Sequence, residues 1–192
     1  MSEGWRESTL PGVVRRTLTT HADPRGSFSE LWRASWTADL AFEFRQANVS
    51  RSSPGVLRAM HFHLRQADLW VVLDGRAFVA VADLRGALTG GREAPPIETF
   101  ELAPGEAVLI PAGVAHGFLA VEALQLAYLV TAEYDGTDEH GFAWDDPTVA
   151  IPWPASAPIL SDRDRGNPGL AEAVAAARVP EGGPQAGQSS TR

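Results

Sequence analysis

The chain has 192 residues, of which 44% are hydrophobic and 21% charged, and its net charge is −8, a composition typical of one soluble globular domain. It contains no cysteine, which excludes disulfides, zinc thiolate sites and cysteine nucleophiles, and it has no basic run of the kind that binds nucleic acid. No apolar run is long enough to span a membrane and residues 1–12 lack the pattern of a secretion signal. We therefore expect a cytoplasmic protein with neither a membrane nor a nucleic-acid partner.

Glycines and prolines separate a series of short apolar runs, and this pattern predicts an all-β domain. Residues 69–82 predict a hairpin, because two β-rich runs flank Asp74-Gly75 and glycine tolerates the positive φ of a type I′ turn. Residues 97–102 alternate apolar and polar side chains, as a half-buried strand does. Further strands are predicted at residues 107–110, after a turn at 104–106, and in residues 117–131, on both sides of a turn at Glu122. Such a string of short strands predicts a barrel or a sandwich.

The C-terminal part of the chain has a different pattern. Asn167-Pro168 precedes residues 169–179, where helix-forming residues place apolar side chains at helical spacing. The residues that follow are polar and rich in glycine, which is typical of a disordered tail. We predict a single domain over residues 1–178, ending in one helix, with a disordered tail at residues 179–192.

Histidines, an aspartate and turn residues recur at spacings that carry chemical meaning. His61 and His63 are two residues apart, so both side chains point to the same face of one strand. Together with Asp68, His116 and the surrounding glycines and prolines, they resemble the two signature motifs of the cupin superfamily. That resemblance implies an all-β cupin fold, a double-stranded β-helix or jelly-roll barrel, here with a short C-terminal helix. In metal-binding members it implies one divalent transition metal, such as Fe, Mn, Ni or Zn, held by four ligands. In this chain they would be His61, His63, Asp68 and His116.

A longer series of fragments resembles the dTDP-4-dehydrorhamnose 3,5-epimerase family, from about residue 10 to residue 170. In chain order the matching fragments are residues 23–30, 46–48, 56–62, 110–118, 132–134, 144–147 and 160–164. The resemblance implies a homodimeric cupin that uses no cofactor and binds a nucleotide-sugar substrate. It also implies proton exchange next to the C4 keto group of a nucleotide-linked 6-deoxyhexose, a reaction that needs a base, a stabilised enolate and an acid on the opposite ring face.

The same resemblance implies roles for individual residues. His61 would be the base, oriented by Asp164, and Tyr134 would be the acid. The substrate-binding residues that it implies are Arg58 and His116 at the sugar, Gln46 and Asn48 on the substrate side, and Arg25, Phe28 and Glu30 at the nucleotide of the partner subunit.

The chain departs from this family at Asp68, which stands where the family has a lysine credited with stabilising the enolate. A carboxylate repels a developing oxyanion. The main interpretation is therefore an epimerase that acts at two carbons or at one. The alternatives are a 3,4-ketoisomerase-like enzyme, favoured by His63, a metal-dependent cupin enzyme, and more remotely a non-enzymatic sugar-binding protein. His61 cannot serve as a free base while its lone pair binds a metal. The presence of Asp164 and Tyr134, which a metal cupin does not need, favours the epimerase without a metal.

Overall fold

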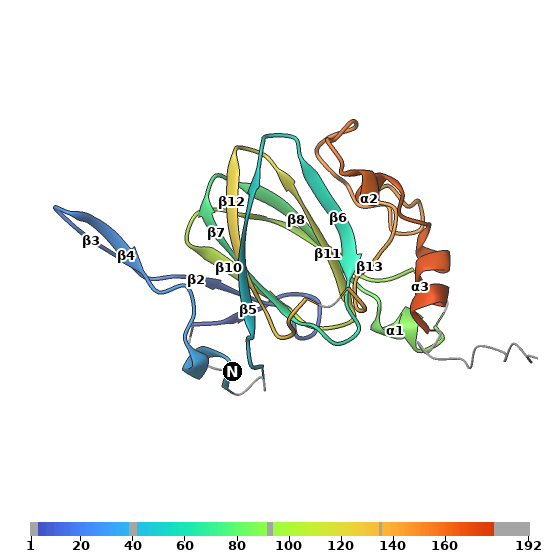
Figure 1. The fold of residues 1–192 in the computed structure, drawn as a ribbon, viewed down its shortest axis with the longest axis horizontal. Helices are drawn as coiled ribbons and strands as arrows, with labels where there is room; N and C mark the ends of the chain where they lie inside the picture. The colour runs from blue at the N-terminus through green and yellow to red at the C-terminus, as the bar shows by residue number, and fades with distance from the viewer. Residues whose placement is uncertain (1–3, 39–41, 92–93, 135, 179–192) are drawn as a thin grey trace, which may run out of the picture.

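The computed structural model describes residues 4–38, 42–91, 94–134 and 136–178, and its strands form two facing sheets (Figure 1). The first sheet has six strands, in the order β1 (Arg6–Glu7), β2 (Val14–Thr17), β10 (Glu106–Ile110), β7 (Asp68–Asp74), β12 (Leu124–Val130) and β5 (Gln46–Ser52). The second has five, in the order β13 (His140–Gly141), β6 (Leu57–Phe62), β11 (Val114–Ala120), β8 (Ala77–Asp83) and β9 (Ile97–Leu102). All pairs within these sheets that the structure describes are antiparallel.

The chain passes from one sheet to the other at Gly75. The two strands predicted within residues 69–82 exist as β7 and β8, but the predicted hairpin is wrong, since β7 pairs with β10 and β12 whereas β8 pairs with β9 and β11. Gly75 has φ +78°, and a Cβ there would lie 2.0 Å from the carbonyl oxygen of Ala123, which lies between β11 and β12. This crossing between sheets is the jelly-roll connection, and the predicted cupin fold class is confirmed.

The other predicted elements fall close to their expected positions. The strand expected at residues 97–102 is β9, and the strand expected at 107–110 is β10, which begins one residue earlier. Residues 117–131 contain the end of β11 and all of β12, with the turn between them. The helix expected within residues 169–179 is α3 (Leu170–Arg178), and the predicted tail at 179–192 lies outside the described residues.

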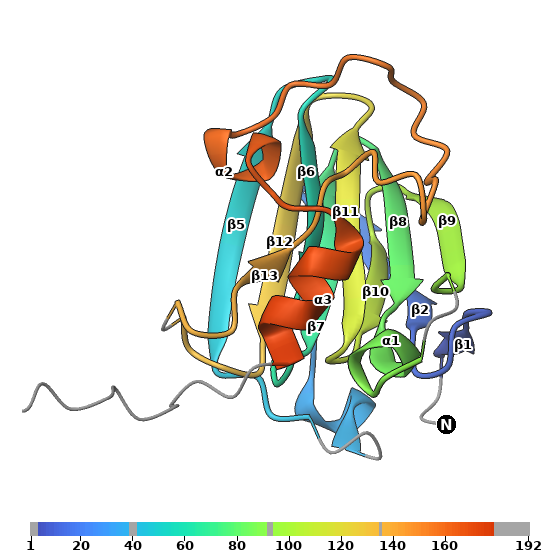
Figure 2. The ribbon, with the colours of Figure 1, turned by 90° about the vertical axis from the view of Figure 1, so that its right-hand side faces the viewer.

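Apolar side chains fill one part of the space between the sheets. They include Val72, Val79, Val81, Val108 and Leu126. A second cluster covers the outer face of the five-stranded sheet, where α3 packs through Leu170, Ala173, Val174 and Ala177 (Figure 2). Two shorter helices, α1 (Arg85–Leu88) and α2 (Asp162–Arg165), flank α3. A 3-10 turn, η1 (Ala34–Trp36), lies near the other sheet. Both faces of the central strands are therefore buried, and polar groups concentrate at the remaining part of the inter-sheet space.

A separate two-stranded arm projects away from the sheets (Figure 1). It consists of β3 (Thr20–Asp23) and β4 (Gly26–Ser29), which pair only with each other among the described strands. Its side chains are exposed except for a half-buried Ser29. No helix in the described ranges has the length and apolar character needed to cross a membrane.

Candidate active site

A pocket of about 200 Å³ opens at the polar part of the inter-sheet space. Strands of both sheets supply its walls, so each sheet contributes charged or aromatic side chains to a shared interior. The lining residues are Ser50, Arg58, His61, His63, Gln66, Asp68, Trp70, His116, Phe118, Leu126, Tyr128, Glu139 and Arg163.

A β-bulge on β6 aims two of these side chains into the pocket. His116 of β11 pairs with His61, but Phe118 pairs with Arg58, so two residues of β6 between these pairs oppose the single Gly117 of β11. The extra residue lets Arg58 and His61 both line the pocket although they are three positions apart. Gly117 permits the close approach, because a Cβ there would lie 2.4 Å from the Cβ of Ala59. The bulge thus sets the direction of the side chain expected to act as base.

His61 is held by Asp164, which arrives from α2. The distance from His61 Nε2 to Asp164 Oδ1 is 2.6 Å. An ionised carboxylate can only accept, so Nε2–H donates to Asp164 and Nδ1 keeps the free lone pair of the neutral ring. Burial raises the pKa of the Asp164 carboxyl, but the hydrogen bond and charge of His61, the hydrogen bond within α2 from Ser161 and the charge of Arg163 together bring that pKa below its usual value. Asp164 therefore stays ionised and orients the imidazole.

Three other titratable residues meet in the interior. His63, Asp68 and His116 are buried, and their potential ligand atoms all lie within 4.8 Å of one another. His116 Nε2 is 3.9 Å from Asp68 Oδ2. Burial lowers the pKa of His116 to about 4, with Asp68 opposing that shift and His63 and His61 adding to it, so this ring is neutral at pH 7. His61 does not belong to the group. The four ligands that the cupin resemblance implied as an alternative are therefore divided: His61 pairs with Asp164, and the other three form a cluster.

The structure places Tyr134 away from the pocket and Tyr128 in its wall. The Tyr134 side chain is 69% exposed, and its backbone N–H donates to Gln46 Oε1 at 3.0 Å. Tyr128 lies on β12, half-buried, and lines the pocket. Burial raises the pKa of the Tyr128 phenol, the charge of Asp68 raises it further, and Arg58 opposes both. The phenol of Tyr128 therefore keeps its proton at neutral pH, as an acid must.

The remaining predicted residues fall into two groups. Gln46 and Asn48 lie on the inward-facing side of β5, where Gln46 Nε2 donates to Asn48 Oδ1 at 2.9 Å and Asn48 pairs with Tyr128. They neighbour the pocket without lining it. Arg25 and Phe28 lie on the projecting arm, with Phe28 64% exposed, and Glu30 directly follows the arm. These three residues are not brought to the pocket of their own chain.

A charged pair at the mouth of the pocket was not predicted from the sequence. Arg163 Nη1 donates to Glu139 Oε2 at 2.9 Å, and both residues line the pocket. Arg163 lies within the fragment around Asp164 that the resemblance selected, which is a signal that could have found it. Nothing in the spacing of Glu139 distinguishes it from a surface residue.

The fold and the pocket define a cupin-type jelly-roll protein with a pocket of titratable side chains between its sheets. The family model described as dTDP-4-dehydrorhamnose 3,5-epimerase matches residues 7–172, and the chain belongs to this family of isomerases.

Individual relatives agree with the family. A dTDP-4-dehydrorhamnose 3,5-epimerase of Mycobacterium tuberculosis is 36% identical over 191 residues, which cover 91% of each chain. A dTDP-4-dehydrorhamnose 3-epimerase of Streptomyces niveus is 36% identical over 180 residues, covering 89% of this chain and 86% of the relative. Among solved structures, the Mycobacterium tuberculosis rmlC epimerase superposes with a TM-score of 0.80 at 34% identity, covering 92% of both chains. The similarity extends over nearly the whole chain, so it applies to the domain and its site together.

Proposed function

We propose that this chain is an epimerase of a dTDP-linked 4-keto-6-deoxyhexose. The observation that carries the proposal is the pocket itself, where an oriented imidazole and a protonated phenol line one cavity between the sheets. Inverting a carbon next to a ketone requires removal of a proton on one face of the ring and its return on the other. The relatives named above act on dTDP-linked keto sugars by their descriptions, which supports the substrate class.

The proposed reaction begins at His61. Nδ1 of the neutral ring takes the proton from the carbon next to the keto group, and the resulting imidazolium is stabilised by the Asp164 carboxylate. The electron pair of the broken C–H bond passes to the keto oxygen, giving an enolate. Tyr128 then donates its phenolic proton to the same carbon from the other face. A solvent proton restores the phenol, and the His61 imidazolium returns its proton to solvent. We propose Tyr128 for this role in place of Tyr134, because Tyr128 lines the pocket and Tyr134 does not.

These proton transfers need no carrier or redox cofactor. Arg58 is proposed to contact the sugar and His116 to lie at the sugar subsite, since both line the pocket. Gln46 and Asn48 are proposed to contact the substrate further out along β5. Whether one carbon or two are inverted depends on which C–H bonds of the sugar reach His61. The relatives named above include a 3,5-epimerase and a 3-epimerase.

We further propose a homodimer in which the arm of one chain serves the pocket of the other. A cavity of about 200 Å³ is smaller than the roughly 300–1,000 Å³ typical of sites for drug-sized ligands, so the nucleotide would lie outside it. Arg25, Phe28 and Glu30 offer a cation, an exposed ring and a carboxylate on or beside a projecting hairpin. Because they lie away from their own pocket, they can bind a nucleotide only beside a second copy. A monomeric mass in sedimentation at micromolar concentration would contradict the dimer. We also propose that the enzyme acts in the cytoplasm, as expected from the sequence.

The test of the proposed function is solvent deuterium exchange. The purified chain is incubated in D₂O with a dTDP-4-keto-6-deoxyhexose, and deuterium at C3 and C5 is followed by mass spectrometry and NMR. We expect incorporation at one or both carbons together with inverted product. Absence of both, under conditions where the chain is folded and dTDP binds, would refute the epimerase.

A further inference from the structure

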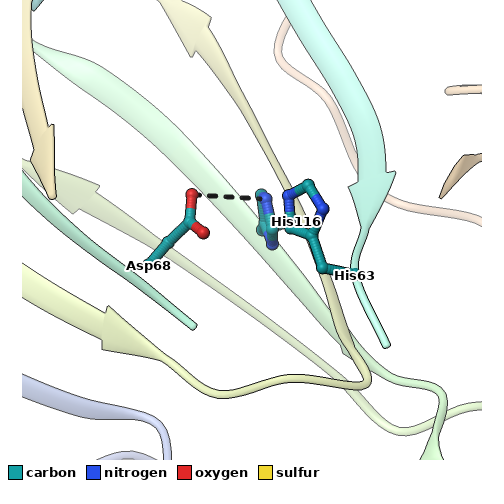
Figure 3. A group of neighbouring side chains, drawn as sticks. All are labelled: His63, Asp68 and His116. Carbon is teal, nitrogen blue, oxygen red and sulfur yellow. Dashed lines mark ion pairs between the residues drawn. The ribbon is translucent and has the colours of Figure 1, made fainter. Parts of the chain in front are cut away.

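His63, Asp68 and His116 converge in the pocket from three different segments (Figure 3). His63 follows β6 directly, Asp68 begins β7 in the opposite sheet, and His116 lies on β11. All three are at least 95% buried, with relative exposures of 5%, 4% and 4%. Two imidazoles and one carboxylate are thus gathered at one interior point, away from the bulk of solvent.

Backbone contacts fix both imidazoles in one tautomer. His63 Nδ1 lies 2.6 Å from the carbonyl oxygen of Asp138, and His116 Nδ1 lies 3.1 Å from that of Val114. A carbonyl can only accept, so each Nδ1 carries the proton and each Nε2 presents its lone pair. This is the arrangement in which a histidine that binds a metal through Nε2 is oriented from behind.

The Asp68 carboxylate is held in the same way. Its Oδ1 accepts from Gln66 Nε2 at 2.8 Å and its Oδ2 from Trp70 Nε1 at 3.2 Å. Each carboxylate oxygen has a second lone pair, so both remain able to bind a cation. Asp138 stabilises the loop from His63 to Asp68, since its carboxylate accepts from the backbone N–H groups of residues 64, 65 and 66. The three side chains are therefore positioned by contacts other than those they make with one another.

The three residues turn acceptors toward one another without a donor between them. Two Nε2 lone pairs and a carboxylate in a buried site repel one another unless a cation or a proton lies between them. We propose that His63, Asp68 and His116 bind one divalent transition-metal ion. The donor set, two imidazoles and one carboxylate with open coordination positions, suits Fe²⁺, Mn²⁺, Co²⁺, Ni²⁺ or Zn²⁺.

The spacing of the donor atoms is close to what such an ion requires. Ligands at about 2.1 Å from a tetrahedral or octahedral ion lie about 3.0–3.4 Å apart. His116 Nε2 and Asp68 Oδ2 are 3.9 Å apart, and all the donor atoms lie within 4.8 Å of one another. Side-chain movements of about 1 Å would bring them to the distances that a bound ion requires. His61 stays outside the ligand set with its Nε2 engaged by Asp164, so metal binding and the proposed base coexist.

An ion in this cluster would have a chemical consequence that rests on the proposed function. The chain contains no lysine, because all 16 of its Lys and Arg positions are arginine. Of the arginines lining the pocket, Arg163 pairs with Glu139, and Arg58 donates to Ser52 Oγ and to the carbonyl of Arg51. A divalent ion offsets the charge of Asp68 and stabilises an enolate oxygen as a Lewis acid. Its place in the same pocket as His61 and Tyr128 suits that role.

The test measures metal binding without substrate, so it does not depend on epimerase activity. The full-length chain is stripped with a chelator, dialysed and titrated with Mn²⁺, Co²⁺, Ni²⁺ and Zn²⁺ by isothermal titration calorimetry. We expect saturation at one ion per chain. Asp68→Asn and His63→Gln should each weaken binding about 100-fold or more, since even residues behind a ligand change affinity 10- to 100-fold. The matched control is Asp74→Asn, at the exposed end of the same strand, which should bind as the unaltered chain does.

A second readout identifies the ligands without any substitution. In the Co²⁺-loaded chain, the Nδ1–H protons of ligated imidazoles give paramagnetically shifted, exchangeable NMR resonances. We expect two, one each from His63 and His116, and a change of less than about threefold in affinity for His61→Asn. Three such resonances, or a His61→Asn variant as weak as His63→Gln, would assign His61 to the ion and overturn the proposal. Absence of stoichiometric binding, or equal binding by Asp68→Asn, would overturn it as well.

The exchange assay then separates the two proposals. If stoichiometric metal binds and the chain exchanges no substrate proton in either form, the epimerase fails and the metal site stands. If exchange proceeds and no metal binds, the metal site fails and the epimerase stands.

Discussion

His61 Nε2 lies 2.6 Å from Asp164 Oδ1, across 103 positions of the sequence. Strand β6 and helix α2 meet through this contact, and Ser161 at the N-cap of α2 accepts from the backbone N–H of Asp164 at 3.1 Å. The capped first turn therefore holds the carboxylate, and the carboxylate holds the imidazole. Because Asp164 is 4% exposed, the pair works in a low dielectric, where its charge acts strongly on the ring.

The first prediction compares the two members of this pair. His61→Ala removes the base and should lower deuterium exchange at least about 1,000-fold, within the range of general-base effects. Asp164→Asn keeps a hydrogen-bond acceptor and removes the charge, so it should lower exchange by less than His61→Ala does. Mass spectrometry of the recovered sugar nucleotide measures both. Exchange unchanged in His61→Ala would show that another group is the base.

The second prediction uses the two tyrosines as a matched pair. Tyr128→Phe keeps the ring in the pocket wall and removes the acid, so substrate protons should still wash out while inverted product falls about 100-fold. Tyr134→Phe removes a hydroxyl from a side chain that is 69% exposed and should leave both rates within about twofold. NMR of the product gives inversion and exchange from one sample. The reverse pattern would return the acid role to Tyr134.

The third prediction concerns Asp146, whose carboxylate accepts a hydrogen bond from the first residue of α3. Its Oδ2 accepts from the Leu170 N–H and its Oδ1 from the Thr148 N–H, both at 2.8 Å. Asp146→Asn leaves one of these donors facing an amide N–H, which should lower the free energy of unfolding by about 1–2 kcal/mol in urea titrations. Asp145→Asn, an exposed neighbour, is the control and should change stability by less than about 0.5 kcal/mol.

The pH dependence of this difference follows from the Asp146 carboxyl. Burial raises its pKa, but the hydrogen bonds from Leu170, Thr148 and Val149 together lower that pKa below the usual value. A carboxyl whose pKa is lower in the folded state stabilises the fold above its unfolded pKa of about 3.9. The stabilisation is lost as the pH falls through the folded pKa. The difference between the unaltered chain and Asp146→Asn should therefore be full at pH 7 and shrink below about pH 4; a constant difference would assign the effect to packing.

The sequence allowed the elements of the fold to be predicted better than their pairing. Alternation and turn residues located β9 and β10 within one residue, because those signals are local. Asp74-Gly75 correctly predicted where β7 ends, but a glycine with positive φ can join neighbouring strands or carry the chain between sheets. Only the tertiary contacts of β7 and β8 decide between them.

The site shows the same limit. The two-residue spacing of His61 and His63 predicted that both point to the same face of one strand; both line the pocket, although His63 lies just beyond the end of β6. The resemblance selected the His61–Asp164 pair. Arg58 joins them only because of the bulge on β6, which strand periodicity cannot reveal. The separation of the four candidate ligands into a pair and a cluster of three depends on the position of α2, which was not predicted.

The last prediction tests the bulge through Gly117. A Cβ at this position would lie 2.4 Å from Ala59 Cβ and 2.9 Å from the carbonyl oxygen of Arg58, so Gly117→Ala must push β6 away from β11. Such overpacking should lower the free energy of unfolding by about 1–3 kcal/mol. It should also lower the rate of deuterium exchange when the variant is still fully folded, because the displaced segment carries Arg58 and leads to His61.

Gly86→Ala provides the control for this substitution. Gly86 lies in α1, and a Cβ there would meet no atom within 4 Å, so alanine should stabilise the chain by about 0.5–1 kcal/mol. Thermal and urea unfolding measure the stability of both variants, and the exchange assay is run at a temperature where each is fully folded. If Gly117→Ala is as stable and as active as Gly86→Ala, β6 tolerates the displacement and the bulge does not position Arg58 and His61.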